Sequence, residues 1–279
     1  MDCLFSIISI IFNNMDISLK TKFERILLEE NKPSSFFEDV KNCPPFYESF
    51  PELFALIGVK QNPKYHAEGD VWTHTMLVLD AAASFRHLVS NPLGFMLSAL
   101  VHDVGKAVCT EEINGVVHSY EHETLGLPLV EKFLRRFSYP DTTITYVLNM
   151  VRLHMKPNKI AVNKSSLKAS NHMFCEAAAP LDLIYLGAAD AMGQIPTGDV
   201  WANIEFLKER LSAYNKIISR PFVTKEQFIS AGYTDGHILE ETMAYSVKLQ
   251  LAGIEKDSAL KQCLSHAACL KRKMEKSLH

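Results

Sequence analysis

Four polar side chains of this sequence stand at positions where helical patterns should turn them toward the protein interior. His102 and Asp103 follow one another at the end of an apolar stretch. His74 lies in the apolar stripe of a separate helical pattern, so we expect its imidazole to point inward. Asp190 stands within a run of apolar residues, where a carboxylate is costly to bury unless it is paired or bound to a cation.

A divalent metal ion is the simplest partner that these four side chains could share. Taken singly, each has a plain structural explanation, because an inward histidine is more often a core residue and a His-Asp pair occurs by chance at helix ends. Together they supply two imidazoles and two carboxylates from three helices. Such mixed ligands suit several first-row metal ions, so the residue types predict a metal site without naming the metal.

The elements that must position these residues are helices. Apolar residues recur at helical spacing along nearly the whole chain. We expect helices over residues 19–27, 71–81, 93–101, 121–137, 141–154, 180–192, 199–218, 236–252 and 257–275.

Helix start and stop signals support several of these boundaries. Ser34 or Ser35 could cap a short second helix. Thr224 and Gln227 have the spacing of a capping box, and Gly232 is a candidate C-terminal stop.

Strand-like alternation is scarce. Asn114-Gly115, between short apolar segments, is the one hairpin-like signal that we find. Glycine is sparse: it makes up 12 of 279 residues, or about 4%, whereas the usual level is about 7%. The sequence therefore predicts an all-α protein with one small β-ribbon.

Composition narrows the class of protein. Hydrophobic residues make up 47% of the chain, which excludes a disordered or low-complexity protein. The formal net charge of −3 gives no global positive field of the kind that nucleic-acid binding favours. The six cysteines are scattered without close pairs, so we expect reduced thiols and a cytoplasmic location.

The N-terminus carries an apolar run, residues 3–12, that is far shorter than the roughly 20 residues needed to span a bilayer. We expect residues 1–14 to be a flexible or non-native tail and expect no stable membrane insertion. A peripheral membrane role for residues 3–12 is a further hypothesis.

Three stretches around the polar residues carry a family resemblance. Tyr65–Thr75 reads YHAEGDVWTHT, Leu100–Lys106 reads LVHDVGK, and His118–Gly126 reads HSYEHETLG. With Asp190 downstream, they resemble the HD-domain superfamily of metal-dependent phosphohydrolases, and most closely the HD domain of bacterial tRNA nucleotidyltransferases, the CCA-adding enzymes. The resemblance extends from about residue 50 to residue 190.

Two departures from that family shape the expected organisation. No Gly-Ser motif followed by paired aspartates is present, so we expect a hydrolase module without the nucleotidyltransferase head. The tail segment after Gly232 lacks both prolines of the family's Gly-x-x-Pro-Gly-Pro segment. The resemblance implies an HD-domain helical bundle over residues 50–195. We expect N-terminal helices over 15–49 and a C-terminal helical extension, 196–279, packed on the HD domain.

The resemblance also implies a fuller set of metal ligands, because HD proteins with two metals use extra histidines between the HD pair and the last aspartate. Asp103 would then bridge two cations, and His118 is an alternative to His122. Whether one or two ions bind stays open, as does their identity among Mn, Fe, Ni, Co and Mg. The predicted ligands are His74, His102, Asp103, His122, His154 and Asp190.

Further residues are candidates for contact with a substrate. Asp103 and Lys106 are the predicted catalytic residues, and Lys106 follows Asp103 closely enough to reach a substrate phosphate. Lys156 opens a stretch of four lysines without an acidic residue, which could attract an anion. His66 and Glu68 precede the His74 helix and could shape the mouth of the site.

The function that follows is metal-dependent hydrolysis of a small phosphoester by a metal-activated water. A nucleoside phosphate or a 2′,3′-cyclic nucleotide fits the resemblance best. The alternative is a non-catalytic RNA- or protein-binding helical module derived from such an HD domain. RNA contact is not favoured by the net charge, and the sequence leaves the oligomeric state open.

Overall fold

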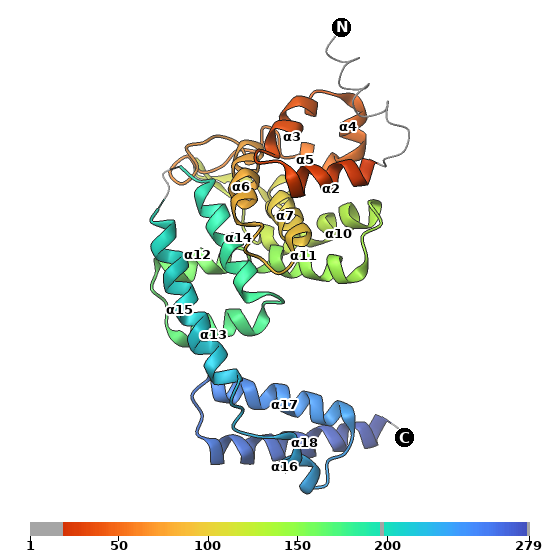
Figure 1. Ribbon diagram of the computed structural model, residues 1–279, viewed down its shortest axis with the longest axis vertical. Helices are drawn as coiled ribbons and strands as arrows, with labels where there is room; N and C mark the ends of the chain where they lie inside the picture. Colours follow the sequence, from red (N-terminus) through yellow and green to blue (C-terminus); the bar gives the residue numbers. More distant parts are fainter. Residues whose placement is uncertain (1–18, 196–197, 278–279) are drawn as a thin grey trace. The chain divides into compact units, whose positions relative to one another are not determined.

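Figure 1 shows a computed structural model that describes residues 19–195 and 198–277 of the chain. The apolar run 3–12 and the predicted tail 1–14 lie outside the described residues. Nearly all regular structure within the described part is helical, apart from one two-stranded ribbon. The predicted fold class, an all-α HD-type bundle with C-terminal helices, is confirmed.

The elements follow in chain order. They are α2 (Leu19–Glu29), α3 (Ser34–Val40), α4 (Pro44–Ser49), α5 (Pro51–Phe54), α6 (Val71–Phe85), α7 (Pro92–Val101), α8 (Lys106–Cys109), β1 (Glu111–Ile113), β2 (Val116–His118), α9 (His122–Leu125), α10 (Leu127–Arg136), α11 (Asp141–Leu153), α12 (Met155–Val162), α13 (Leu167–Glu176), α14 (Pro180–Met192), α15 (Val200–Ile218), α16 (Lys225–Ser230), α17 (Gly236–Leu251) and α18 (Lys256–Ser277).

The chain divides into two compact units that are not two consecutive halves of the sequence. Unit 1 takes the residues up to Ser165 and again Glu176–Lys208. Unit 2 takes Ser166–Cys175 and the residues from Glu209 onward. Among the described residues, no helix is both long enough and apolar enough to cross a membrane.

Helix α7 is the central element of unit 1. Its sequence, PLGFMLSALV, is apolar on every side, and such a helix must be surrounded by others. It packs against α2, α6, α11 and α14. Every residue from Gly94 to Val101 is buried, so the residues that follow α7 enter the interior of the bundle.

The start of α6 follows the sequence prediction, whereas the start of α3 does not. Asp70 caps α6 by accepting a hydrogen bond from the backbone N–H of Thr73 at 2.9 Å. Ser34, predicted as a cap of α3, is instead its first residue. Its N–H and hydroxyl donate to the two carboxylate oxygens of Asp80, at 3.0 and 2.7 Å. A carboxylate from α6 thus satisfies one of the orphan backbone donors at this helix start, and the prediction that Ser34 or Ser35 supplies the cap is wrong.

The predicted hairpin is present. Strands β1 and β2 pair antiparallel, with Glu111 opposite His118 and Ile113 opposite Val116. Asn114 and Gly115 both adopt positive φ, 54° and 76°, which a two-residue type I′ turn requires.

The predicted helix over 121–137 is divided. It consists of α9 and α10, which meet at Gly126. Pro128 in the first turn of α10 has no N–H to continue the α9 hydrogen-bond ladder, so a new helix starts there.

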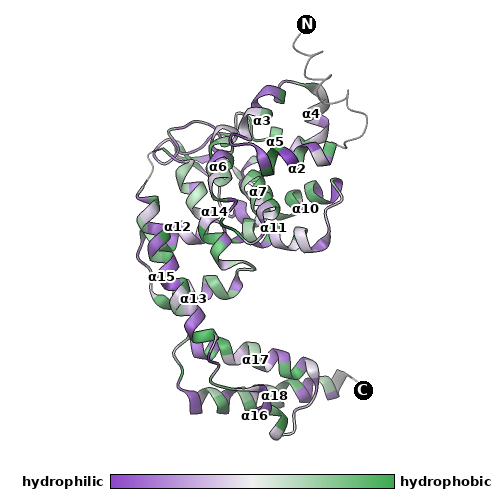
Figure 2. Ribbon diagram, viewed as in Figure 1, coloured by the Kyte–Doolittle hydropathy of each residue, from purple (hydrophilic) through white to green (hydrophobic). Residues whose placement is uncertain are grey.

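Unit 2 is built on amphipathic helices, visible in Figure 2 as alternating green and purple along α17 and α18. At the end of α16, Gly232 has a φ of 86° and the N–H of Tyr233 donates to the carbonyl of Phe228 at 3.0 Å. The predicted stop at Gly232 is therefore present. The buried core of the unit consists of Val223, Phe228, Leu239, Leu249, Ala259 and Cys263.

Candidate metal centre

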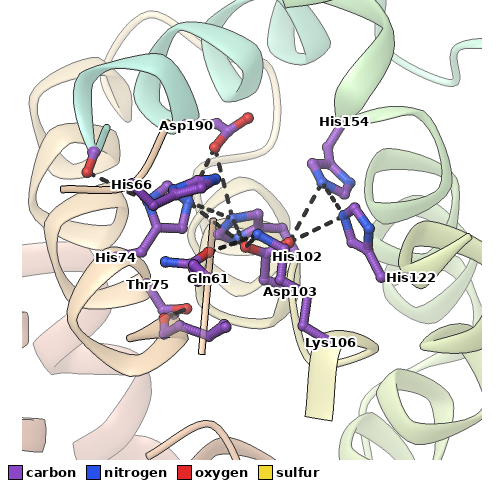
Figure 3. A network of polar contacts seen from close by, with 12 residues as sticks. Gln61, His66, His74, Thr75, His102, Asp103, Lys106, His122, His154 and Asp190 are labelled. Carbon is purple, nitrogen blue, oxygen red and sulfur yellow. Dashed lines mark hydrogen bonds and ion pairs between the residues drawn. The ribbon is translucent and has the colours of Figure 1, made fainter. Parts of the chain in front are cut away.

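Five segments of unit 1 bring six buried polar side chains to one place (Figure 3). Helix α6 supplies one histidine, the end of α7 a histidine and an aspartate, the start of α9 and the α11–α12 junction one histidine each, and α14 an aspartate. None is more than 5% exposed. These are the six ligands named by the sequence prediction: His74, His102, Asp103, His122, His154 and Asp190.

One group, which we call the first half-site, consists of His74, His102, Asp190 and the Oδ2 atom of Asp103. His74 Nε2 lies 3.1 Å from Asp190 Oδ1 and 3.4 Å from His102 Nε2. The same nitrogen is 3.6 Å from Asp103 Oδ2, and His102 Nε2 is 3.3 Å from that oxygen. Two imidazole nitrogens and two carboxylate oxygens thus face a common centre.

A second half-site lies on the other oxygen of Asp103 and consists of that Oδ1 atom, His122 and His154. The Nε2 atoms of the two histidines are 3.3 Å apart. They lie 3.2 and 3.8 Å, respectively, from Asp103 Oδ1. Asp103 therefore stands between two pairs of imidazoles, with one oxygen toward each.

Three of the four histidines are oriented in the same way by the backbone. Each ring places Nδ1 against the carbonyl oxygen three residues earlier in the chain, where it donates a hydrogen bond. This assigns the proton to Nδ1 and turns Nε2 toward Asp103, the arrangement usual for histidines that bind metals. The pairs are His102 with Ala99 at 2.8 Å, His122 with Ser119 at 2.9 Å and His154 with Val151 at 2.6 Å.

His74 is oriented by a carboxylate. Its Nδ1 lies 3.1 Å from Glu68 Oε1, which also accepts from His66 Nδ1 at 2.7 Å, and the other Glu68 oxygen accepts from the N–H of Ile195 at 3.0 Å. Burial opposes protonation of His74, but its hydrogen bonds to Asp190 and Glu68 outweigh burial and raise its pKa to about 9. The structure thus places His66 and Glu68 directly behind the first half-site.

The electrostatics of Asp103 fit a cation. Both of its oxygens are buried and, within the described residues, neither has a hydrogen bond of good geometry. Burial favours the neutral acid, yet the neighbouring imidazole of His102 and the ammonium of Lys106 hold the pKa of Asp103 well below its usual range. An ionised, buried carboxylate without hydrogen bonds is costly unless a positive charge compensates it.

The spacing of the donor atoms also fits a metal ion. Ligands about 2.1 Å from an ion lie about 3.0 Å apart at right angles and about 3.4 Å apart at the tetrahedral angle. Most separations within the two half-sites fall in or near that range. Burial and the imidazole of His102 also lower the pKa of His154 to about 3, which keeps it in the neutral form that a metal requires. The residues present can therefore hold a divalent ion.

Lys106 lies inside this network. Its Nζ is 2.7 Å from Asp103 Oδ2, off the direction of a hydrogen bond, and it donates to Gln61 Oε1 at 2.9 Å. The Gln61 amide in turn donates to the carbonyl of Asp70 at 3.2 Å. Sequence reasoning missed Gln61, because a glutamine in a loop before α6 matches no helical pattern.

Asn158 is a second residue that sequence reasoning missed. Its Nδ2 donates to Asp190 Oδ2 at 3.3 Å, which orients the other oxygen of that carboxylate toward His74. Asn158 follows His154 by four residues, one turn of α12, and that spacing is the signal that could have found it.

Two candidates from the sequence lie elsewhere. The ammonium of Lys156 pairs with the carboxylate of Glu176, which belongs to neither half-site. His118, the alternative to His122, stacks on Tyr120 with ring centroids 4.8 Å apart.

Glycines allow the metal-site segments to approach one another closely. A Cβ on Gly105 would lie 2.0 Å from the carbonyl oxygen of His122 and 2.9 Å from the N of Gly126. Only a residue without a Cβ fits there, and this allows the turn after Asp103 to pack directly against α9, which begins with His122.

Comparison with known proteins agrees with this geometry. Residues 71–193 match the family model of the HD domain. This stretch begins at the helix of His74 and ends three residues after Asp190, so it contains all six buried ligand candidates. HD domains bind divalent metals, and residues 71–193 of this chain are similar to that domain.

Curated relatives are similar to this chain over the same region. The Multifunctional CCA protein of Ralstonia nicotianae is 35% identical over 127 residues, which is 46% of this chain and 28% of the relative. The proteins of the same name from Alkalilimnicola ehrlichii and Hahella chejuensis are 27% and 26% identical, over 85% and 77% of this chain. These longer matches cover 55% and 49% of the relatives, so the chain spans about half the length of the proteins it matches.

Proposed function

We propose that the HD region of this chain is a metal-dependent phosphohydrolase that acts on a small phosphoester, either a nucleoside phosphate or a 2′,3′-cyclic nucleotide. The observation that carries the proposal is the position of Asp103 between two pairs of buried imidazoles, each pair with its Nε2 atoms within 3.4 Å of one another. Two sites that share one carboxylate suit a reaction in which an attacking and a leaving oxygen must both be stabilised.

The proposed ligands divide as the two half-sites do. His74, His102 and Asp190 would hold one divalent ion and His122 and His154 a second, with Asp103 shared. A bound divalent cation would supply polarisation of a phosphoryl oxygen and acidification of an attacking water. Mn, Fe, Ni, Co and Mg all accept this mixture of nitrogen and oxygen ligands.

The remaining polar residues would act by charge and orientation. The ammonium of Lys106 lies beside Asp103, where it would neutralise charge on a phosphoryl oxygen. Gln61 restricts where that ammonium can point. Glu68 holds the proton on His74 Nδ1, and Asn158 holds the Asp190 carboxylate, so that the donor atoms stay aimed at one centre.

The proposal of a nucleotide-like substrate rests on the similarity of this chain to its curated relatives. The relatives carry the name Multifunctional CCA protein, and the similarity to them covers the HD region. We propose residues 50–195 as the hydrolase domain and 196–279 as its helical extension.

A phosphoester panel tests the proposal. Phosphate release would be assayed with added manganese, nickel, cobalt or magnesium. The wild type would be compared with a His102→Ala/Asp103→Ala variant and with a control at an exposed histidine, His87→Ala. We expect activity in the wild type and the control, and none in the double variant. Absence of activity in the wild type would overturn the proposal and favour a non-catalytic binding module, and full activity in the double variant would place the activity elsewhere.

A further inference from the structure

A stacked aromatic pair, formed by the half-buried His118 and the exposed Tyr120, directly precedes His122 of the second half-site in the chain. His118 is the last residue of β2, and Tyr120 lies in the turn that follows it. The rings stack with centroids 4.8 Å apart and an interplanar angle of 12°. Tyr120 is 60% exposed. Because His118 covers one face of the phenol ring, the exposed area leaves the other face open.

The backbone between the two rings is fixed to the proposed metal centre. Ser119, which lies between them, accepts the hydrogen bond from Nδ1 of His122 through its carbonyl oxygen at 2.9 Å. The Ser119 hydroxyl bonds to the hydroxyl of Thr110 at 2.7 Å, across the base of the β-ribbon. An open aromatic face is therefore held in a defined position relative to a candidate metal ligand.

The separation suits a ligand with two ends. Tyr120 and His122 are two residues apart, a span of at most about 7 Å between their Cα atoms. Glu121 between them has a φ of 57°, so the chain turns sharply and one residue is buried while the other stays exposed. Because this span is short, a molecule whose phosphate lies at the second half-site needs to extend only a short way to reach the Tyr120 ring.

We propose that the His118–Tyr120 pair is the platform on which the base of a nucleotide substrate stacks. The inference rests on the proposed phosphohydrolase function and deepens it by naming the residues that would hold the base of the nucleotide. Stacking of a base on an aromatic side chain stabilises binding and tolerates any base, because every base has a π-face. The platform therefore gives selectivity for the presence of a base and little selectivity for which base.

The test compares two substrates that differ only in the base. The ratio of kcat/KM for adenosine monophosphate to kcat/KM for ribose 5-phosphate would be measured in the wild type, Tyr120→Ala, Tyr120→Phe and Tyr47→Ala. Tyr47 is a matched control, because it is 41% exposed and packs on Phe54 in a different helix. We expect the ratio to fall about 10-fold in Tyr120→Ala, and to stay within about 2-fold of wild type in the other two variants.

A binding measurement separates this inference from the proposed function. Fluorescence anisotropy of ethenoadenosine monophosphate would report binding without turnover, with ribose 5-phosphate as competitor. Base-dependent binding that is lost in Tyr120→Ala supports the platform even if no phosphoester is hydrolysed. If Tyr120→Ala hydrolyses both substrates with the wild-type ratio of kcat/KM values, the platform is overturned and the phosphohydrolase function is not. Absence of nucleotide binding by the wild type also overturns the platform.

Discussion

Asp103 is the residue on which both half-sites depend, because each of its oxygens faces a different pair of imidazoles. Its charge is compensated by neighbours that hold positive charge or a proton, among them Lys106 and His74. A divalent ion that enters this cluster must therefore compete with charges already there. Metal binding to such a site releases protons.

The proton on His74 makes metal affinity dependent on pH. Its pKa is raised to about 9, so below pH 9 the imidazole is protonated and cannot offer Nε2 to a metal. We expect the affinity for Mn²⁺ to rise between pH 7 and pH 9, by up to about tenfold per pH unit, and to level off above pH 9. Competition titration at pH 7, 8 and 9 measures this slope.

A Glu68→Gln variant serves as the control, because loss of the Glu68 carboxylate removes one of the groups that raise the pKa of His74. The rise in affinity should then be complete at a lower pH. An affinity that does not change between pH 7 and pH 9 in the wild type would contradict this role of the His74 proton.

His122 and His154 were predicted from the resemblance to the HD domain, and the other cluster residues because polar side chains stand within or at the end of apolar stretches. His74 and Asp190 stand out in that way, since burial of an unpaired polar group is costly. Gln61 and Asn158 could not be predicted with the same argument. Their contacts join segments far apart in the chain, and an amide in a loop or on a helix surface is common without any role.

At the scale of elements, the centre depends on how closely the turn after α7 approaches α9. Gly105 and Gly126 lie against one another, and each would place a Cβ about 3 Å or less from the backbone of the other. This contact sets the position of Asp103 relative to His122. It allows no side chain at either glycine.

Gly105→Ala should therefore disturb both stability and metal binding. The new methyl group would lie 2.0 Å from the carbonyl oxygen of His122, so the backbone must shift. We expect a loss of about 1–3 kcal/mol in the free energy of unfolding and weaker binding at the second half-site. Thermal unfolding and metal titration of the variant measure the two effects.

Gly236→Ala is the matched control, because a Cβ at that position meets nothing within 4 Å. It should leave both quantities unchanged. If Gly105→Ala kept wild-type stability and metal affinity, the close approach of the turn to α9 would not matter for the site.

The long helices could be predicted from the sequence, whereas a helix break and a helix cap could not. The predicted helix over 180–192 has the bounds of α14, because its apolar face is long and its ends are marked. The division of the predicted helix 121–137 was missed, since periodicity alone does not show where a hydrogen-bond ladder is interrupted. The cap of α3 was wrong because Asp80, its true partner, lies 46 residues beyond Ser34.

At the scale of the whole molecule, all six candidate ligands lie in unit 1, and unit 2 has a hydrophobic core of its own. Helix α13, from the middle of the chain, belongs almost entirely to unit 2. This interleaving could not be predicted from the sequence. The apolar face of α13 indicates that it buries one side, but not which neighbours cover it.

Because unit 2 has a core of its own, a destabilising substitution there should leave metal binding in unit 1 unchanged. Phe228 is fully buried in the core of unit 2, and Phe228→Ala should destabilise that unit by about 3–5 kcal/mol. We expect the number of metal ions bound per chain to stay at the wild-type value. Calorimetry with and without added metal separates the two effects, and loss of metal binding in this variant would show that the units are not independent.

The measurement that tests the central claim most directly is the metal content of purified protein, wild type and Asp103→Ala, after equilibration with a divalent ion and removal of the excess. Our account predicts one or two ions per wild-type chain. Asp103→Ala should bind substoichiometric metal while retaining the far-ultraviolet circular dichroism of a helical protein. A wild-type chain that binds no ion, or an Asp103→Ala chain that binds as many ions as the wild type, would contradict a metal centre built on Asp103.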